Sequence, residues 1–277
     1  MSLSLMVCFA RSGGTILNRC LGSLPDVVIM SEVNPVWSGS GDDADLSTVR
    51  TQAKQWYNID LRSENYTDSI LELEEICNKE GKHLVIRDWP FINFVPFPFN
   101  NMKPAGSLVA IEELTGKCDF KAFAFVRDAI DVWISRGADP DVESFFNEYL
   151  AYVKAVVATG MPVFKYEDFC SDPDSIMKEI CEYTGIPYSE SYRNYASFVN
   201  AKGDIERTSP SRGAKKDFIR PLKRKLLSAK KMKRLKSATP CTPQMREANS
   251  LLNYPTYEKG INLRGSFFAR ALDRLFR

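Results

Sequence analysis

The alternation of short apolar runs with amphipathic stretches predicts strands connected by helices. The predicted strands cover residues 3–9, 27–30, 83–87, 120–126 and 162–166. The predicted helices cover residues 15–21, 48–57, 68–79, 142–159 and 173–183. Short apolar strands that alternate with helices are typical of a parallel sheet covered on both faces. The pattern therefore predicts an α/β fold with a parallel β-sheet flanked by helices.

Local signals strengthen two of the predicted helices. Asp172 is a suitable N-cap for the helix 173–183, and Pro173 suits its first position. Asp68 carries the start signal of the helix 68–79. Regular signals weaken after Lys202. We therefore interpret the chain as one domain, residues 1–277, in which 202–277 form an extension packed on the rest.

The composition supports a folded protein. The 277 residues are 44% hydrophobic and 12% aromatic, which is enough to bury a sizeable core and excludes wholesale disorder. No window approaches the ~18 uninterrupted apolar residues that a membrane helix needs. Residues 1–9 lack a basic start and run directly into a polar loop, so we interpret them as a buried strand rather than a signal peptide.

The seven cysteines and the single histidine narrow the chemistry. The cysteines are scattered, odd in number and free of Cys-x-x-Cys pairs, which favours reduced thiols in a cytoplasmic protein over a disulfide or zinc framework. His83 is the only histidine, so a Ser-His-Asp triad, a Cys-His dyad or a His-rich metal site would have to use it. No metal is expected.

The net charge of +2 hides an asymmetry along the chain. Residues 202–277 hold 20 basic and 6 acidic residues, net +14, which leaves 17 basic and 29 acidic residues, net −12, in 1–201. The C-terminal quarter therefore faces something anionic or is neutralised by the rest of the chain.

The residues that follow each predicted strand are candidates for a ligand site, because ligands of parallel sheets bind beyond the carboxyl ends of the strands. Three arginines stand in such positions, Arg11, Arg87 and Arg127. Carboxylates follow four of the strands, namely Glu32, Asp88, Asp128, Glu167 and Asp168. This set suits a polyanionic ligand with a base beside it.

The loop after the first strand has the composition of a phosphate-binding turn but not that of a Walker A motif. That motif requires a lysine where this loop has Gly14 or Thr15, and its first glycine is missing. Without the lysine, ATP γ-phosphate chemistry loses a main electrostatic partner. Arg11 places a charge on the other side of the loop.

Three segments together resemble the PAPS-dependent sulfotransferase family, and most closely its bacterial branch. Residues 10–17, Ala-Arg-Ser-Gly-Gly-Thr-Ile-Leu, are similar to the 5′-phosphosulfate loop, typically Pro-Arg/Lys-Ser-Gly-Thr/Ser-Thr before an apolar pair. Residues 126–136 resemble the 3′-phosphate segment, with an arginine after a strand and a serine eight positions later. Residues 165–187 match the Lys-Tyr-Glu-Asp, Asp-Pro and Gly-Ile-Pro stretch. The resemblance spans about residues 3–212.

The sequence departs from the family pattern at two positions in the loop. Ala10 replaces the usual proline, and Gly14 replaces a hydroxyl residue that often touches the phosphate. Residues 203–212 are a weaker match to the C-terminal loop that closes over the nucleotide.

The resemblance implies a sulfotransferase of P-loop-type α/β fold that transfers a sulfuryl group from PAPS to an acceptor hydroxyl or amine. It assigns the 5′-phosphosulfate to Arg11 and the backbone N–H groups of Ser12, Gly13, Gly14 and Thr15. It assigns the 3′-phosphate to Arg127 and Ser135, joined by Arg212. No metal is required.

Three residues compete for the role of general base. Glu32 follows the second predicted strand, and bacterial members of the family often carry a glutamate there. Asp88 follows the third predicted strand. His83 has the pKa of a good base, but it begins its strand, which places it at the edge opposite the cofactor. Glu32 is the preferred candidate.

An aromatic stretch interrupted by prolines, residues 89–99, follows the third predicted strand. We interpret it as a wall or lid for the acceptor, with Asp88, Trp89 and Phe91 as substrate-binding residues. The alternative is a packed loop that closes the core.

The segment 220–236 has nine basic residues and no acidic one. It is interpreted as a solvated helix that attracts the cofactor; a membrane surface, nucleic acid or an acidic acceptor remain alternatives. Residues 267–276 form an apolar helical stripe expected to dock on the protein or on a second copy. The acceptor, a small molecule, glycan or lipid, and the oligomeric state stay open.

Two rival functions follow from the same features. The first is a P-loop kinase with a degenerate loop, which the absent Walker lysine disfavours. The second is a non-enzymatic protein that binds anions or nucleic acid through its basic tail, although no specific nucleic acid is expected as a partner.

Overall fold

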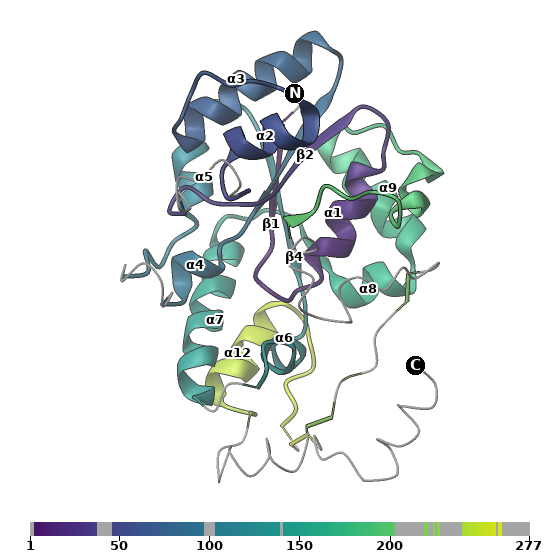
Figure 1. The fold of residues 1–277 in the computed structure, drawn as a ribbon. Helices are drawn as coiled ribbons and strands as arrows, with labels where there is room; N and C mark the ends of the chain where they lie inside the picture. The colour runs from purple at the N-terminus through teal and green to yellow at the C-terminus, as the bar shows by residue number, and fades with distance from the viewer. Residues whose placement is uncertain are drawn as a thin grey trace. The chain divides into compact units, whose positions relative to one another are not determined.

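The computed structural model describes residues 3–37, 46–96, 103–138, 141–202, 219–220, 224, 226–227, 240–258 and 260–261 (Figure 1). They include a five-stranded sheet of order β2-β3-β1-β4-β5 in which all neighbours are parallel. The strands are β1 (Leu3–Val7), β2 (Val27–Val33), β3 (His83–Asp88), β4 (Lys121–Val126) and β5 (Val163–Lys165). The predicted parallel α/β sheet is confirmed.

Helices connect the strands. They are α1 (Gly14–Gly22), α2 (Val49–Tyr57), α3 (Tyr66–Lys79), α4 (Phe91–Phe94), α5 (Val109–Leu114), α6 (Ala129–Ser135), α7 (Val142–Ala158), α8 (Tyr166–Ser171), α9 (Pro173–Thr184), the 3₁₀ helix η1 (Glu190–Asn194) and α12 (Pro243–Leu251). The five predicted helices are confirmed. Most of the others are too short to show a helical period.

The helix termini agree with the capping signals in one case and correct them in another. The Asp172 carboxylate accepts a hydrogen bond from the N–H of Ser175 at 3.1 Å, as expected for the N-cap of α9. The helix α3 begins two residues before Asp68, because the Asn65 side chain is its N-cap and accepts from the Asp68 N–H at 2.8 Å. The predicted start at Asp68 was therefore wrong by two residues.

The chain divides into two compact units. The sheet unit comprises Met1–Val126 and Thr159–Pro221, and the helical unit comprises Arg127–Ala158 and Leu222–Arg277. In the helical unit α12 packs against α6 and α7. This part of the predicted C-terminal extension therefore packs on earlier elements of the chain, whereas residues 267–276 lie outside the described residues.

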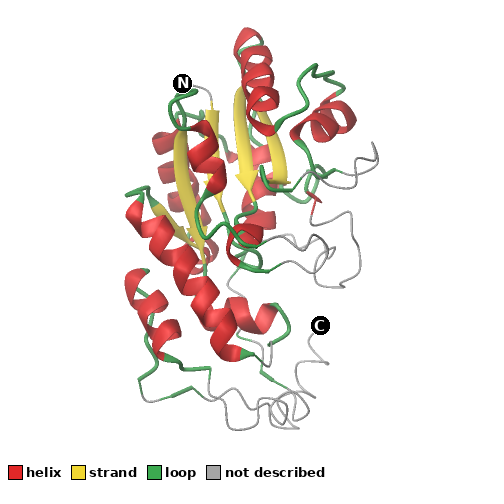
Figure 2. Ribbon diagram, turned by 90° about the vertical axis from the view of Figure 1, so that its left-hand side faces the viewer, coloured by secondary structure: helices red, strands yellow, loops and turns green. Residues whose placement is uncertain are grey.

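The sheet unit carries helices on both faces of the sheet (Figures 1 and 2). One face packs against α1, α8, α9 and η1 through an apolar cluster that includes Met6, Val85, Phe123 and Phe125, all fully buried. On the other side α3 packs on β3, and α2 lies along β2. Burial of both faces explains why the strands read as continuous apolar runs rather than alternating ones.

Two side chains of α2 satisfy the backbone of β2, the edge strand. The Gln52 amide accepts from the Ser31 N–H at 2.6 Å and donates to the Ser31 carbonyl at 2.7 Å. The Tyr57 hydroxyl accepts from the Ile29 N–H at 3.0 Å and donates to the Ile29 carbonyl at 3.2 Å. These bonds replace a neighbouring strand and hold in place the end of β2 that carries Glu32.

No helix in the described ranges is long and apolar enough to cross a membrane.

Candidate functional site

A tight turn connects β1 to α1. The Ser12 N–H donates to the Phe9 carbonyl at 3.1 Å, and Gly13 is the N-cap of α1. Gly13 has φ 88° and Arg11 has φ 74°, both in the left-handed region. The turn brings the N–H groups at the start of α1 to the carboxyl end of the sheet. Strand, glycine turn and helix N-terminus form the arrangement that binds anions in α/β proteins.

Gly13 lies against the ring of Tyr166, the first residue of α8. A Cβ atom at position 13 would stand 2.3 Å from Cδ2 of Tyr166 and 2.7 Å from its Cε2. Tyr166 is buried and packs edge-on against Phe125. Two of the three segments that carry the family resemblance, the loop 10–17 and the stretch that begins at Lys165, therefore meet at this contact.

Gly14 is constrained by different neighbours. A Cβ atom there would lie 2.5 Å from the Cys8 sulfur and 2.9 Å from Nε of Arg87. This explains the departure from the family pattern at position 14. The space that a hydroxyl side chain would need is occupied by a buried thiol and a guanidinium.

Arg87 and Glu32 form a partly buried ion pair beside the loop. The Arg87 guanidinium contacts Oε1 of Glu32 at 2.6 Å and Oγ of Ser31 at 3.4 Å. The Arg87 side chain is 5% exposed and that of Glu32 is 21% exposed. Sequence reasoning placed Arg87 at a strand end but missed this pairing, because no local pattern relates residues 55 positions apart.

Glu32 does not follow β2 as predicted but lies inside it. The register of β2 against β3 shifts between Ser31 and Val33, and Glu32 has φ 54° at this bulge. The prediction that the strand ends at Met30 was wrong, because an apolar run cannot show that pairing continues past a bulge. Bulges re-aim side chains next to functional sites.

Asp88, the last residue of β3, is completely buried. Its Oδ1 accepts a hydrogen bond from Asn34 Nδ2 at 2.7 Å, and the same amide donates to Asn93 at 2.9 Å. Its Oδ2 has no hydrogen-bond partner among the described residues. Burial raises the pKa of Asp88 to about 7, against the opposing effect of the hydrogen bonds from Asn34 and from the Trp89 backbone.

The raised pKa of Asp88 makes stability depend on pH. The folded state holds the proton more tightly than the unfolded chain, whose aspartate has an ordinary pKa. This group's stabilising contribution is therefore lost as pH rises from about 4 to about 7, and it changes no further above that pH. Between pH 5 and pH 8 the free energy of unfolding should fall in the wild type. In Asp88→Asn we expect this fall to be smaller by about 2–3 kcal/mol. Urea unfolding at both pH values measures this.

The exposed Asp119→Asn is the matched control and should keep the wild-type pH dependence. Parallel curves for Asp88→Asn and the wild type would show that Asp88 does not titrate in this range.

The aromatic stretch after β3 is partly helical. Phe91, the first residue of α4, is 7% exposed and packs edge-on against Phe9 with ring centroids 5.3 Å apart. Trp89 is half-buried, and its ring centroid lies 5.6 Å from that of Phe91. Phe9 precedes the loop, so these rings adjoin the turn; residues 97–99 lie outside the described residues.

His83 stands at the other end of its strand. It is the first residue of β3, which runs parallel to β1, whereas the loop follows the carboxyl end of β1. Burial lowers the pKa of His83. The histidine is therefore separated from Asp88 by the length of the strand, as the sequence predicted.

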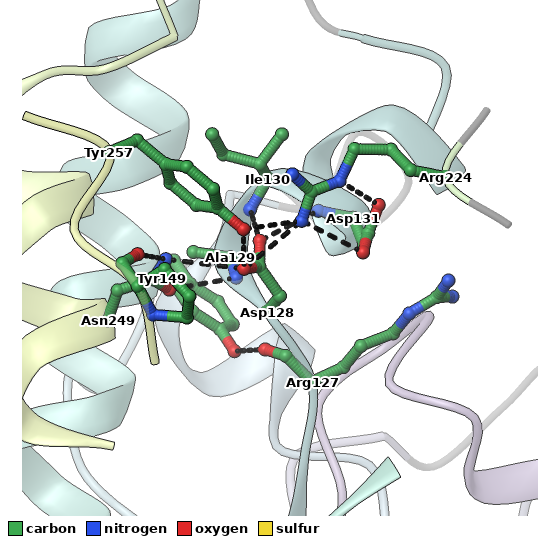
Figure 3. Close-up of polar contacts among 10 residues, drawn as sticks. Arg127, Asp128, Ala129, Ile130, Asp131, Tyr149, Arg224, Asn249 and Tyr257 are labelled. Atoms are coloured by element: carbon green, nitrogen blue, oxygen red, sulfur yellow. Dashed lines mark hydrogen bonds and ion pairs between the residues drawn. The ribbon is translucent and has the colours of Figure 1, made fainter. Parts of the chain in front are cut away.

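In the helical unit, Arg127 precedes the N-cap of α6 and Ser135 ends the helix. Arg127 is half-buried, and its carbonyl accepts a hydrogen bond from the Tyr149 hydroxyl at 2.9 Å. Asp128 is the N-cap of α6 and accepts from the Ile130 N–H at 2.9 Å (Figure 3). Ser135 is the last residue of α6 and is half-buried. The predicted Arg212 lies outside the described residues.

Metal ligands do not gather in the described ranges, where no group of three or more His, Cys, Asp or Glu residues is placed to hold a metal ion. All seven cysteines lie in these ranges and are free thiols.

Comparisons with known proteins identify the fold. The chain matches the sulfotransferase domain from the curacin biosynthetic pathway with a TM-score of 0.58 and 14% identity, over 92% of this chain and 99% of that one. It matches the sulfotransferase domain of the Synechococcus PCC 7002 olefin synthase with a TM-score of 0.58 and 14% identity, over 91% and 95%. Neither the family models nor the curated proteins give a match to the sequence.

The protein therefore has the P-loop-type α/β fold of the sulfotransferases. The resemblance that the three sequence segments indicate is confirmed at the level of the fold.

Proposed function

We propose that this protein is a PAPS-dependent sulfotransferase. The observation that carries the proposal is the turn from Ser12 to Gly14, held against Tyr166 on one side and against Arg87 on the other. The sulfotransferase fold supports the proposal, and in this chain the turn stands at the carboxyl end of β1, the central strand, where ligands of parallel sheets bind.

The turn fits the 5′-phosphosulfate of such a donor. The Ser12 hydroxyl and Nε of Arg87 are buried without a hydrogen-bond partner among the described residues. No acidic residue stands in the first turn of α1 to repel an anion. Arg11, the Ser12 hydroxyl and the N–H groups at the start of α1 would hold the 5′ end, so that charge developing on the leaving phosphate meets donors already in place. The Ser12 N–H, which the sequence also assigns to this role, donates to the Phe9 carbonyl instead.

The 3′-phosphate is assigned to the helical unit. Arg127 offers a guanidinium fork that suits bidentate binding of a phosphate, and Ser135 adds a hydroxyl donor. Arg212 is proposed to join them. When bound, PAPS supplies the activated sulfuryl group; the protein supplies orientation and charge stabilisation, and no metal is proposed.

Glu32 is proposed as the general base that accepts the proton of the acceptor hydroxyl or amine. Its carboxylate is partly exposed and is held by Arg87 at 2.6 Å, which fixes its direction. Asp88 is the second candidate, because its pKa of about 7 suits a base. Its complete burial makes it less accessible than Glu32 to an acceptor.

The acceptor is proposed to be a small molecule, a glycan or a lipid. Trp89 and Phe91 would form an apolar wall beside the loop, with Asp88 behind them. A cytoplasmic location is proposed from the seven free thiols.

Thermal shift with three ligands tests the proposal. We expect 3′-phosphoadenosine-5′-phosphate at about 100 times its Kd to raise Tm by about 5–10 °C. Arg127→Ala and Ser135→Ala should abolish most of this shift, whereas Ser144→Ala, in α7, should retain it. A shift with ATP and Mg²⁺ alone would favour the kinase. A shift with heparin or DNA alone would favour the binding protein.

A further inference from the structure

A cluster of polar side chains in the helical unit surrounds the backbone that carries Arg127 (Figure 3). Arg224 and Tyr257 belong to the C-terminal part of the chain, about 90 and 130 positions beyond the residues that they contact. Tyr257 belongs to no sequence motif, Arg224 is one of the nine basic residues of the segment 220–236, and the proposed transfer reaction uses neither.

Asp128 is at the centre of the cluster. Its Oδ2 accepts from the Tyr257 hydroxyl at 2.6 Å and from Asn249 Nδ2 at 3.5 Å, and it lies 3.2 Å from the Arg224 guanidinium. Its Oδ1 caps α6 through the Ile130 N–H. Because Asp128 is 4% exposed, these bonds operate in an environment where water competes little.

Arg224 connects the remaining members. Its Nε donates to Asp131 at 2.8 Å, and one terminal nitrogen donates to the Tyr257 hydroxyl at 2.7 Å. The guanidinium also stands over the Tyr257 ring, 5.0 Å from the centroid. A single cation thus bridges both carboxylates of the segment that follows Arg127.

The backbone around Arg127 is held from further sides. The Tyr149 hydroxyl donates to the Arg127 carbonyl at 2.9 Å, and the Ala129 N–H donates to the Asn249 side chain at 3.0 Å. The Arg127 side chain itself extends away from the cluster (Figure 3). The cluster therefore fixes where the Arg127 side chain starts.

Tyr257 is held in an unfavourable backbone conformation. Its φ is 54°, in the left-handed region that a tyrosine rarely adopts. Such a conformation persists only where the surrounding contacts over-determine it, and they do so often at ligand-binding sites. The hydroxyl contacts with Asp128 and Arg224 are the contacts that Tyr257 gains in return.

We propose that Tyr257 and Arg224 are positioning residues for recognition of the donor's 3′-phosphate. They act through Asp128 and Asp131, holding the turn so that Arg127 presents its guanidinium in one direction. Arg224 also offsets two carboxylates that would otherwise draw Arg127 away from a phosphate. The inference rests on the proposed function, in which Arg127 binds that phosphate.

Two nucleotides that differ only in the 3′-phosphate test the inference. Calorimetry gives Kd for 3′-phosphoadenosine-5′-phosphate and for adenosine-5′-phosphate. We expect Tyr257→Phe to weaken the first about 10-fold and the second less than about 2-fold, since one hydrogen bond to a charged group is lost. Arg224→Gln should act in the same direction and more strongly, and it serves if Tyr257→Phe does not fold.

Lys154→Ala is the matched control, because the Lys154–Glu247 pair at 2.7 Å likewise joins the C-terminal part of the chain to an earlier helix, α7, but lies on the surface. It should change neither Kd. In an Arg127→Ala background, Tyr257→Phe should cause no further loss, because the effect passes through Arg127.

Each outcome decides the inference. Equal weakening of both nucleotides, or an additive double mutant, would overturn it and leave the proposed function standing. A wild type that binds neither nucleotide would overturn both. Selective, non-additive loss of the 3′-phosphorylated nucleotide supports it.

Discussion

Gly13→Ala is expected to destabilise the protein and to disable the loop together. The residue has φ 88°, and an added Cβ would stand 2.3 Å from the Tyr166 ring. That ring cannot move aside cheaply, because it is buried in the apolar cluster of the sheet unit. We expect a loss of about 2–4 kcal/mol in the free energy of unfolding from strain and overpacking. A displaced loop should lower kcat/KM about 100-fold.

Gly185→Ala separates backbone strain from overpacking against a neighbour. Gly185, the C-cap of α9, has φ 83° and ψ 9°, almost the conformation of Gly13, but an added Cβ there meets nothing within 4 Å. It should cost only the backbone term, about 1 kcal/mol, with unchanged activity. Urea unfolding and sulfuryl-transfer assays measure both variants. Equal losses in the two would show that the Tyr166 contact does not shape the loop.

Glu32→Gln is expected to lower kcat about 100- to 10,000-fold and to leave donor binding nearly unchanged. Glutamine has the same length and keeps an oxygen for the Arg87 guanidinium, so the pair is weakened rather than left without an acceptor. What it lacks is the ability to take a proton. Steady-state kinetics of sulfuryl transfer measures kcat, and calorimetry with 3′-phosphoadenosine-5′-phosphate measures donor-site binding.

Two further variants separate the roles of the carboxylates. Glu113→Gln removes a carboxylate that pairs with Lys117 on the surface, and it should behave as the wild type. If Asp88→Asn abolishes turnover while Glu32→Gln turns over normally, the base is Asp88. The wild-type activity would then fall below about pH 7, where Asp88 becomes protonated.

In the helical unit, one residue of the basic C-terminal part pairs with acidic residues of the earlier part of the chain. Arg224 belongs to the basic segment 220–236, which was interpreted as a solvated helix. Its side chain is 24% exposed and bridges Asp128 and Asp131. For this residue, neutralisation by the acidic part of the chain replaces attraction of an external anion. Most of the remaining segment lies outside the described residues.

The sequence by itself determined the fold class and the order of the main elements. Apolar runs and helical periods depend on neighbouring residues, so β1 to β5 and the longer helices were predictable within a few residues. The glycines of the loop 10–15 likewise predicted the tight turn between β1 and α1, because a backbone φ in the left-handed region favours glycine. The nine-residue α12 was missed although Thr242 and Pro243 carry start signals.

Only the tertiary structure decided which side chains meet. Residues far apart in the chain meet in the ion pair of Glu32 with Arg87 and in the contact of Gly13 with Tyr166. The burial of Asp88 likewise depends on distant segments that pack around it. The bridge from Arg224 to Asp128 also joins distant residues. Burial and the charge of neighbouring groups set the direction of a pKa shift, and packing sets the space around a glycine. Both arise only when distant segments of the chain come together. A linear pattern does not contain that information, so the sequence named the candidates and the fold assigned their neighbours.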